Sequence, residues 1–189
     1  MSGGPELPTS AVFDPGADPA LAAAVLEIEA HVADGGWDRP ARLYALVDTA
    51  QLVAQEPELA ALMGLDDASA AGSLTPIEQE EFAPGVRLED ELASISWPDG
   101  VTGCAAVVER LVLPPGADAD LPDDPAAAEA YAAGHPDRQE VRMIAGVTRA
   151  GAAFCALRLR SHDDPQSVVS GPDLVPQLLE LLRATLEDE

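Results

Sequence analysis

The chain contains no lysine and no asparagine among its 189 residues. Both amino acids have AT-rich codons, so their absence indicates a high-GC bacterial genome. The 10 cationic residues are therefore all arginines, and 34 acids outnumber them to give a formal net charge of -24. Because such a chain repels nucleic-acid phosphates and anionic lipid headgroups, we expect neither a nucleic-acid partner nor a membrane partner.

Aromatic residues are also scarce, at 4% of the chain, and cysteine occurs only at positions 104 and 155. Alanine, valine and leucine must therefore build the core, for which 47% hydrophobic residues are sufficient. Each cysteine lies in an apolar run without CxxC spacing, which is typical of a buried free thiol in a reducing cytosol. A redox pair or a nucleophile is the alternative interpretation.

Long apolar runs and a secretion signal are absent as well, so we expect a cytoplasmic protein. Residues 1–17 are rich in glycine and proline and carry little pattern, which predicts a flexible N-terminal arm. No break typical of a domain boundary follows, and no internal repeat. We therefore expect residues 18–189 to form a single α+β domain.

Apolar spacing, capping residues and breakers predict the elements of this domain. A capping box formed by Thr75 and Glu78 predicts one of the helices. Pro57 is expected to divide another into two pieces. The predicted helices cover residues 18–34, 48–64, 75–82, 124–134 and 171–189, and a helical turn is expected at the start of "LEDELASISWPDG" (88–100). The predicted strands cover residues 41–48, 103–113, 139–149 and 152–161, with a short strand that ends at Trp97.

The order of these elements predicts an α+β fold. Neighbouring strands joined by short turns favour a mainly antiparallel sheet of about five strands. We expect a two-layer architecture in which the helices pack mostly on one face of this sheet.

Half of the arginines lie between residues 138 and 160, where five arginines accompany a single acid, Glu140. Strand alternation assigns side chains to the two faces of the sheet. We expect one open face to be lined by Arg110, Arg142, Arg158 and Arg160, with apolar patches from Cys104, Val108, Ile144 and Phe154. In this assignment Glu109 falls among the apolar residues of its strand.

Two interpretations of the arginine face remain open. In one, the arginines pair with local acids such as Glu109, Asp163 or Asp164 and merely reduce self-repulsion. In the other, they bind an acidic peptide, a carboxylate or phosphate ligand, or a second copy of the chain. Arginine suits such ligands because its planar guanidinium binds oxyanions bidentately.

The last predicted helix is apolar over a wide arc, which indicates that it is either well buried or shared with a partner. Its apolar residues are Leu174, Val175, Leu178, Leu179, Leu181, Leu182 and Leu186. Catalytic motifs are absent: there is no GxSxG, Walker A or GxGxxG sequence. His31, His135 and His162 lie far apart, so we expect no metal site, no cofactor and no catalytic residue.

Most of residues 37–182 resembles an uncharacterised family of small acidic proteins from high-GC Gram-positive bacteria. The stretches that carry the resemblance include "WDRPARLYALVDTAQL", "LTPIEQEE", "ISWPDGVTGCAAVVERLVLPP", "HPDRQEVRMIAGVTRAGAAFCALRLRSHDD" and "GPDLVPQLL". This family implies no activity and no functional residues. The order of the elements is also similar to that of type III secretion chaperones, whose sheet face or helices bind partner chains and make dimers.

Two functions are consistent with these observations. The first is a non-enzymatic binding, chaperone-like or regulatory module that uses the basic sheet face and the apolar C-terminal helix. Its partner would be a protein, with a second copy of the chain as the alternative. The second function is an enzyme of unknown chemistry that acts on a small anionic ligand held by the arginine face.

Overall fold

The computed structural model describes residues 18–66, 72–79, 82–83, 86–114 and 116–187, and the structural statements below concern these residues. The predicted flexible arm, residues 1–17, lies outside the described residues. Among the helices that are described, none has both the length and the apolar character needed to cross a membrane.

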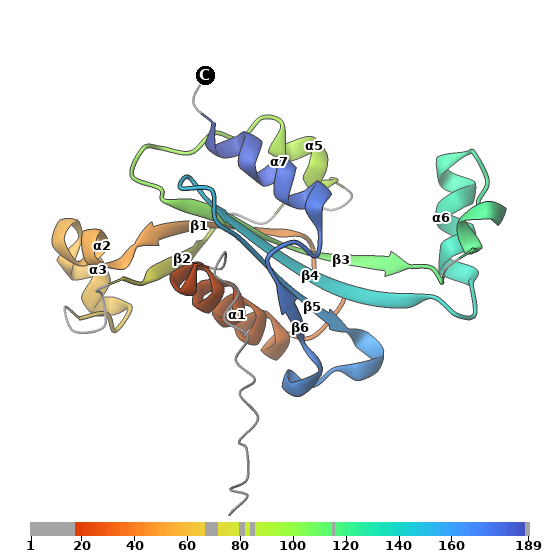
Figure 1. Cartoon of the computed structure of the whole chain (residues 1–189), viewed down its shortest axis with the longest axis horizontal. Coiled ribbons are helices and arrows are strands. Elements are labelled where there is room, and N and C mark those ends of the chain that lie inside the picture. The colour runs from red at the N-terminus through yellow and green to blue at the C-terminus, as the bar shows by residue number, and fades with distance from the viewer. Residues whose placement is uncertain (1–17, 67–71, 80–81, 84–85, 115, 188–189) are drawn as a thin grey trace, which may run out of the picture.

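The centre of the fold is an antiparallel sheet whose six described strands follow the order β2-β1-β3-β4-β5-β6 (Figure 1). This confirms the predicted α+β class and the mainly antiparallel sheet. The strands are β1 (Arg42–Asp48), β2 (Leu74–Glu78), β3 (Gly103–Val112), β4 (Gln139–Thr148), β5 (Ala153–Leu159) and β6 (Val169–Gly171).

Helices cover both faces of the sheet, whereas we expected them mostly on one face. Helix α1 (Pro19–Asp34) packs on one face, and α5 (Leu88–Leu92) and α7 (Pro176–Leu186) pack on the other (Figure 1). The reason is that the central strands are apolar on both sides: residues 103–108 of β3 are all buried. A strand of this kind needs a layer on each face.

The remaining helices lie at the ends of the sheet (Figure 1). Helices α2 (Thr49–Gln55) and α3 (Pro57–Leu62) follow β1 and are divided at Pro57, as predicted. Helix α6 (Pro125–Gly134) stands beyond the far ends of β3 and β4. Three short 3-10 turns complete the description: η1 (Ala117–Asp120), η2 (Arg160–His162) and η3 (Pro165–Ser167).

Helix α1 follows the sequence pattern closely. The Asp18 carboxylate accepts hydrogen bonds from the backbone N–H groups of Ala20 and Leu21, so it caps the helix, and Pro19 occupies the first helical position. The stripe of residues at helical spacing is buried against the sheet, with at most 2% exposure; it consists of Leu21, Val25, Ile28 and Val32.

Two predicted elements are wrong. Residues 74–78 form β2 instead of a helix, because they pair with β1 and because the Thr75 hydroxyl is buried against that of Thr49 at 2.8 Å. Pairing between distant segments here outweighs the local capping signal. The strand expected to end at Trp97 is absent among the described residues, which form turns and irregular backbone there. The last helix begins at Pro176, and Gly171 belongs to β6.

The C-terminal helix buries its apolar arc within the chain. Leu178, Leu179, Leu182 and Leu186 of α7 are buried in the core beneath that helix, and Leu174, Val175 and Leu181 pack against the same core. Of the two interpretations of this helix, burial within the domain therefore accounts for most of its apolar residues.

Strands β3 and β4 continue past the end of β1, and their last residues also continue past β5, which pairs with β4 only from Val141 onward. Strand β1 pairs with β3 only as far as Val107, whereas β3 and β4 pair on to Val112 and Gln139. We refer to residues 108–112 of β3 and 139–143 of β4 as the ribbon. The ribbon leads to α6, which stands apart from the other helices (Figure 1).

Candidate functional site

The four predicted site residues do not share one face of the sheet. Arg142 lies opposite Glu109 on β3 and opposite Arg158 on β5, so these three side chains form a row on the face that α1 covers. Arg110 lies opposite Val141 and therefore points to the other face, beneath α7. The predicted alternation within β3 is correct, but the expected register between β3 and β4 was wrong by one residue. Such a slip moves every side chain of one strand to the opposite face relative to its neighbour.

The face that carries Arg142 and Arg158 is not open. The exposed fraction is 1% for Arg142 and 5% for Arg158, because α1 and the loop that follows it cover them. Of the three arginines on this side of the sheet, Arg160 is the one that reaches the solvent, with 40% of its side chain exposed. The expectation of an open basic face is therefore wrong, although each arginine takes part in a charged cluster.

Arg158 is held by two carboxylates. Its Nε donates to Glu29 Oε1 at 2.6 Å, its Nη2 donates to Glu29 Oε2 at 3.2 Å, and its Nη1 donates to Asp163 Oδ1 at 3.0 Å. Burial alone would lower the pKa of Arg158, but the hydrogen bonds to Asp163 and Glu29 outweigh it and raise that pKa. The same bond from Arg158, followed by one from Trp37, lowers the pKa of Asp163.

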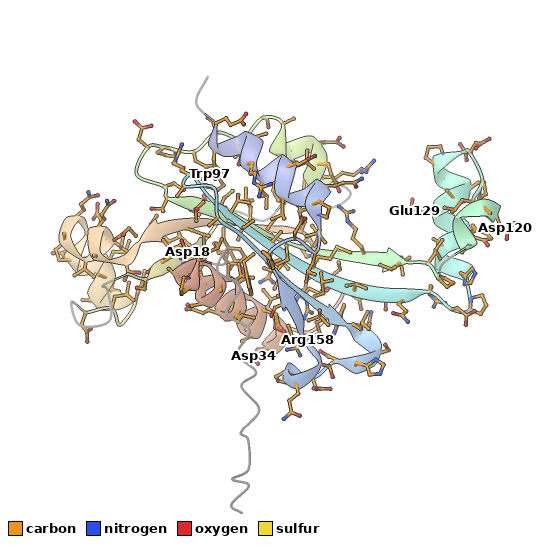
Figure 2. All side chains as sticks on the ribbon, in the orientation of Figure 1. Asp18, Asp34, Trp97, Asp120, Glu129 and Arg158 are labelled. Atoms are coloured by element: carbon orange, nitrogen blue, oxygen red, sulfur yellow. The ribbon has the colours of Figure 1, made fainter. Side chains whose placement is uncertain are left out.

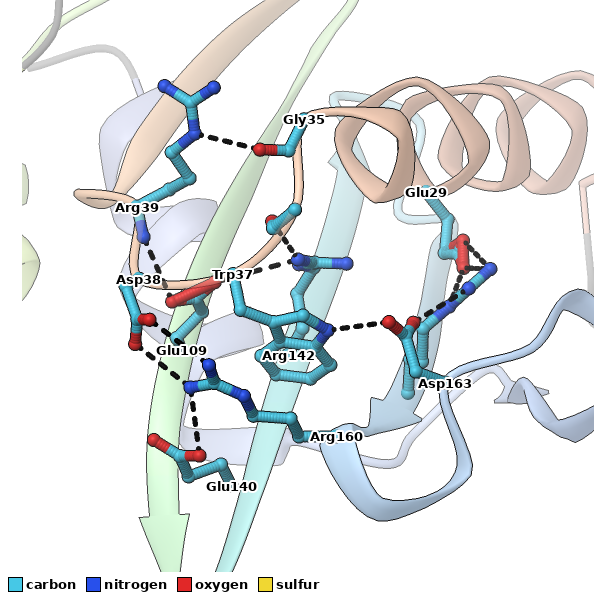
Figure 3. Close-up of polar contacts among 12 residues, drawn as sticks. Glu29, Gly35, Trp37, Asp38, Arg39, Glu109, Glu140, Arg142, Arg160 and Asp163 are labelled. Carbon is cyan, nitrogen blue, oxygen red and sulfur yellow. Dashed lines mark hydrogen bonds and ion pairs between the residues drawn. The ribbon is translucent and has the colours of Figure 1, made fainter.

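Trp37 closes the row from above (Figure 3). Its ring centroid lies 4.3 Å from Arg142 Cζ and 5.7 Å from Arg160 Cζ, which are cation–π distances. Its Nε1 donates to Asp163 Oδ2 at 3.0 Å. The loop turns over the sheet through positive φ angles of 78° at Gly36 and 64° at Asp38.

Arg142 is the most deeply buried cation of the row. Its Nη2 donates to the backbone oxygen of Gly36 and lies 3.6 Å from Glu109 Oε1. Its Nε and Nη1 find no hydrogen-bond partner among the described protein groups. Glu109 also accepts a hydrogen bond at 3.1 Å from the backbone N–H of Arg39, which ties the loop to β3.

Arg160 completes the cluster at its solvent edge. It donates bidentately to Asp38 at 2.9 and 3.1 Å and also donates to Glu140 at 3.0 Å. The three arginines of the row and its edge thus meet five acids: Glu29, Asp38, Glu109, Glu140 and Asp163. Three cations and five anions give a net charge of -2, so the predicted basic patch is an internally neutralised network. Asp164, expected to join it, instead caps η3.

The other predicted site residue, Arg110, pairs with Glu89 of α5 on the opposite face. The pair lies at a cleft of about 390 Å³ between the sheet and α7. Apolar side chains from β3, β4 and α7 line much of this cleft, including those of Val108, Met143, Leu178 and Leu181.

Both cysteines are buried free thiols, as predicted. Cys104 contacts the Leu182 carbonyl at 3.7 Å and the Thr185 hydroxyl at 3.6 Å, and burial raises its pKa to about 11. Such a thiol stays protonated at neutral pH, where a nucleophile would need to be a thiolate. Within the described parts of the chain, no three histidine, cysteine or acidic side chains gather as metal ligands would.

Sequence reasoning missed three members of the network: Glu29, Trp37 and Asp38. For Glu29 a signal exists, because it follows Val25 by four residues and so falls within the buried stripe of α1. An acid in that position requires a buried partner. For β3, the awkward place of Glu109 was the signal, since an acid opposite Arg142 gives the observed register. The loop that carries Trp37 has no such pattern.

Comparison with protein families gives a single assignment. A family model described as PPA1309-like protein matches residues 21–187, so the chain belongs to the PPA1309-like protein family. No curated protein matches the chain. No solved structure matches it either, so the similarity of its topology to that of secretion chaperones stays a prediction.

Proposed function

We propose that this protein is a non-enzymatic, cytoplasmic protein-binding module whose partner contacts the ribbon and α6. The single observation that carries the proposal is that none of the ten residues of α6 is buried. Every helix that packs on a face of the sheet contributes to a core, whereas α6 contributes nothing to either one. The two free thiols fit a reducing compartment.

Helix α6 is held mainly by local contacts. The Asp124 carboxylate caps it by accepting from the backbone N–H of Ala127 at 3.0 Å, and the rings of Tyr131 and His135 meet edge to face at 5.8 Å. Isolated helices shorter than about 12–15 residues are marginal in water, because helix formation needs tertiary packing to be stable. A ten-residue helix at the end of a ribbon therefore gains most from a surface supplied by another protein.

The alternative function, an enzyme acting on a small anionic ligand, draws no support from Arg158 and Arg160. The hydrogen-bond donors of Arg158 are engaged by Glu29 and Asp163, and those of Arg160 face Asp38 and Glu140. An anion would have to displace these carboxylates within a cluster whose net charge is already negative. Electrostatic repulsion opposes such a ligand.

Site-specific photo-crosslinking tests the proposed contact. The substitution Tyr131→p-benzoylphenylalanine places the probe on α6, and Leu62→p-benzoylphenylalanine places it on α3, where Leu62 is 87% exposed. In lysate of the source organism we expect one defined adduct from the α6 probe that excess unlabelled protein suppresses. The α3 probe should give none.

Two outcomes would contradict the proposal. If both probes give the same adducts, α6 is only an exposed surface like α3. If the α6 probe gives no adduct while the chain remains folded, α6 has no protein partner under those conditions.

A further inference from the structure

We propose that the partner binds by strand addition, as an extended cationic segment that pairs with the open edge of β3 at residues 108–112. This inference rests on the proposed function and specifies its binding mode and the chemistry of the partner. Strand β1 stops pairing with this edge at Val107, and the loop before β1 reaches it through the hydrogen bond from the Arg39 N–H to the Glu109 carboxylate. No described strand therefore pairs with the outer edge of residues 108–112. Among the described residues, the backbone groups of residues 108–112 form hydrogen bonds with β4 and with no segment on their other side.

The two outer edges of the sheet are protected, unlike this one. Strand β2 carries Pro76, which has no N–H to donate to a further strand. Strand β6 has only three residues and includes Gly171. Short edge strands and proline are devices by which proteins avoid pairing with other chains. The edge of β3 has neither device, and its charged residues Glu109 and Arg110 are already engaged in internal pairs.

Apolar side chains on both faces of this edge are exposed. Leu111 points to the α1 face and is 39% exposed, and Val112 points to the α7 face and is 40% exposed. An added strand would cover both, because its own side chains alternate between the same two faces. On the α7 face the strand would run beside the cleft lined by Val108, Met143 and Leu181, which offers a place for an apolar side chain.

The acidic residues near this edge indicate that the partner segment is cationic. Residues 113–138, which connect β3 to β4 and include α6, contain six acids and a single cation, Arg138. Figure 2 shows Asp120 and Glu129 of this connection far from the body of the molecule. A second copy carries a formal net charge of -24 and the same acidic connection, so like charges oppose its approach. A segment that alternates apolar residues with lysine or arginine satisfies both the exposed apolar edge and the acidic surroundings.

The test uses a synthetic peptide of about nine residues that alternates valine and arginine, long enough to span the edge. Fluorescence anisotropy should detect binding, and hydrogen exchange should show protection of amides in residues 108–112. Two further peptides serve as references: one with glutamate in place of arginine, and one with proline in place of alternate valines. We expect each to bind at least about tenfold more weakly.

A matched pair of variants separates the edge from general charge attraction. Leu111→Lys/Val112→Lys alters the edge, and Leu59→Lys/Leu62→Lys adds the same charge on α3, where both leucines are exposed. The first variant should weaken binding of the valine–arginine peptide at least about tenfold, and the second should leave it within about twofold. Because all four side chains are at least 39% exposed, both variants should keep the melting temperature of the parent.

Three outcomes would overturn the inference. If both variants weaken peptide binding equally, net charge and not the edge of β3 accounts for the binding. A concentration-dependent dimer in sedimentation that only Leu111→Lys/Val112→Lys abolishes would assign the edge to a second copy. An adduct at the α6 probe without protection of residues 108–112 in that complex would reject strand addition and leave the proposed function standing, whereas absence of the adduct would remove the proposed function itself.

Discussion

The two faces of the sheet solve the same packing problem with different chemistry. Beneath α7, the central strands contribute alanines, valines and two protonated thiols to an apolar core. Beneath α1, the same strands contribute an apolar core and, beside it, a row of charges in which Arg142 and Arg158 are almost fully buried. Alternation along a strand therefore separates two environments that are one residue apart in the sequence.

This contrast shows which of the two layers fixes the position of the helix that covers it. An apolar layer tolerates shifts and exchanges of side chains of similar volume. A buried ion pair does not, because removing one partner leaves a charge without compensation, while replacing both partners is often neutral. We infer that the row under α1 fixes the position of that helix and its loop, whereas the layer under α7 supplies stability by area alone.

Removing the acid that α1 contributes should have the largest effect. Glu29→Ala leaves Arg158 buried with only Asp163 as a partner, so we expect a loss of about 3–5 kcal/mol in the free energy of unfolding. Urea denaturation measures it. The double variant Glu29→Leu/Arg158→Met should recover most of this loss, since it removes both charges. A loss below about 1 kcal/mol for Glu29→Ala would show that water reaches the pair.

Truncating the opposite layer should cost somewhat less. Leu182 is fully buried against the sheet beside Cys104, so Leu182→Ala should lower the free energy of unfolding by about 2–4 kcal/mol through the cavity it leaves. Leu181→Ala on the same helix is the matched control, because Leu181 is only partly buried. Equal losses for the two substitutions would mean that α7 does not pack as described.

Lowering the pH should destabilise the charged layer more than the apolar layer, by less than either substitution above. The hydrogen bonds from Arg158 and Trp37 lower the pKa of Asp163 in the folded state, so its contribution is complete above the unfolded pKa of about 3.9. That contribution is lost as the pH falls through the lower folded pKa. In thermal melts between about pH 5 and 2, Asp163→Asn should therefore show a shallower loss of stability than the parent chain. Leu182→Ala should shift the curve without changing its slope; identical slopes in all three proteins would contradict this assignment.

Elements that depend on local pattern were predictable from the sequence. The stripe of α1, the division at Pro57 and the β4–β5 hairpin all rest on neighbouring residues, and each occurs as predicted. Strand β2 was not predictable in this way, since its capping box competes with pairing to a strand about thirty residues away. The number of layers was missed because the apolar residues on the second face of the sheet, such as Cys104 and Val108, were interpreted as patches on an open face, whereas they are buried.

The site was predictable in its residues and not in its geometry. Arg142, Arg158 and Arg160 do gather, but a shift of one residue in β3 separated Arg110 from them and brought in Glu109. The cover over the row comes from α1 and from the loop at Trp37, and alternation within strands carries no information about what lies above a sheet. In the sequence, only Glu29, an acid within the apolar stripe of α1, indicated that a helix would cover this face.

The placement of the tryptophans gives each layer its own optical label. The chain has two: Trp37 lies against the guanidinium groups of Arg142 and Arg160, and Trp97 donates to the Thr185 hydroxyl on α7 at 3.0 Å. Replacing one of them by phenylalanine leaves a fluorophore that senses only one side of the sheet. The emission of such single-tryptophan chains can therefore time the release of the charged layer and of the apolar layer separately during unfolding.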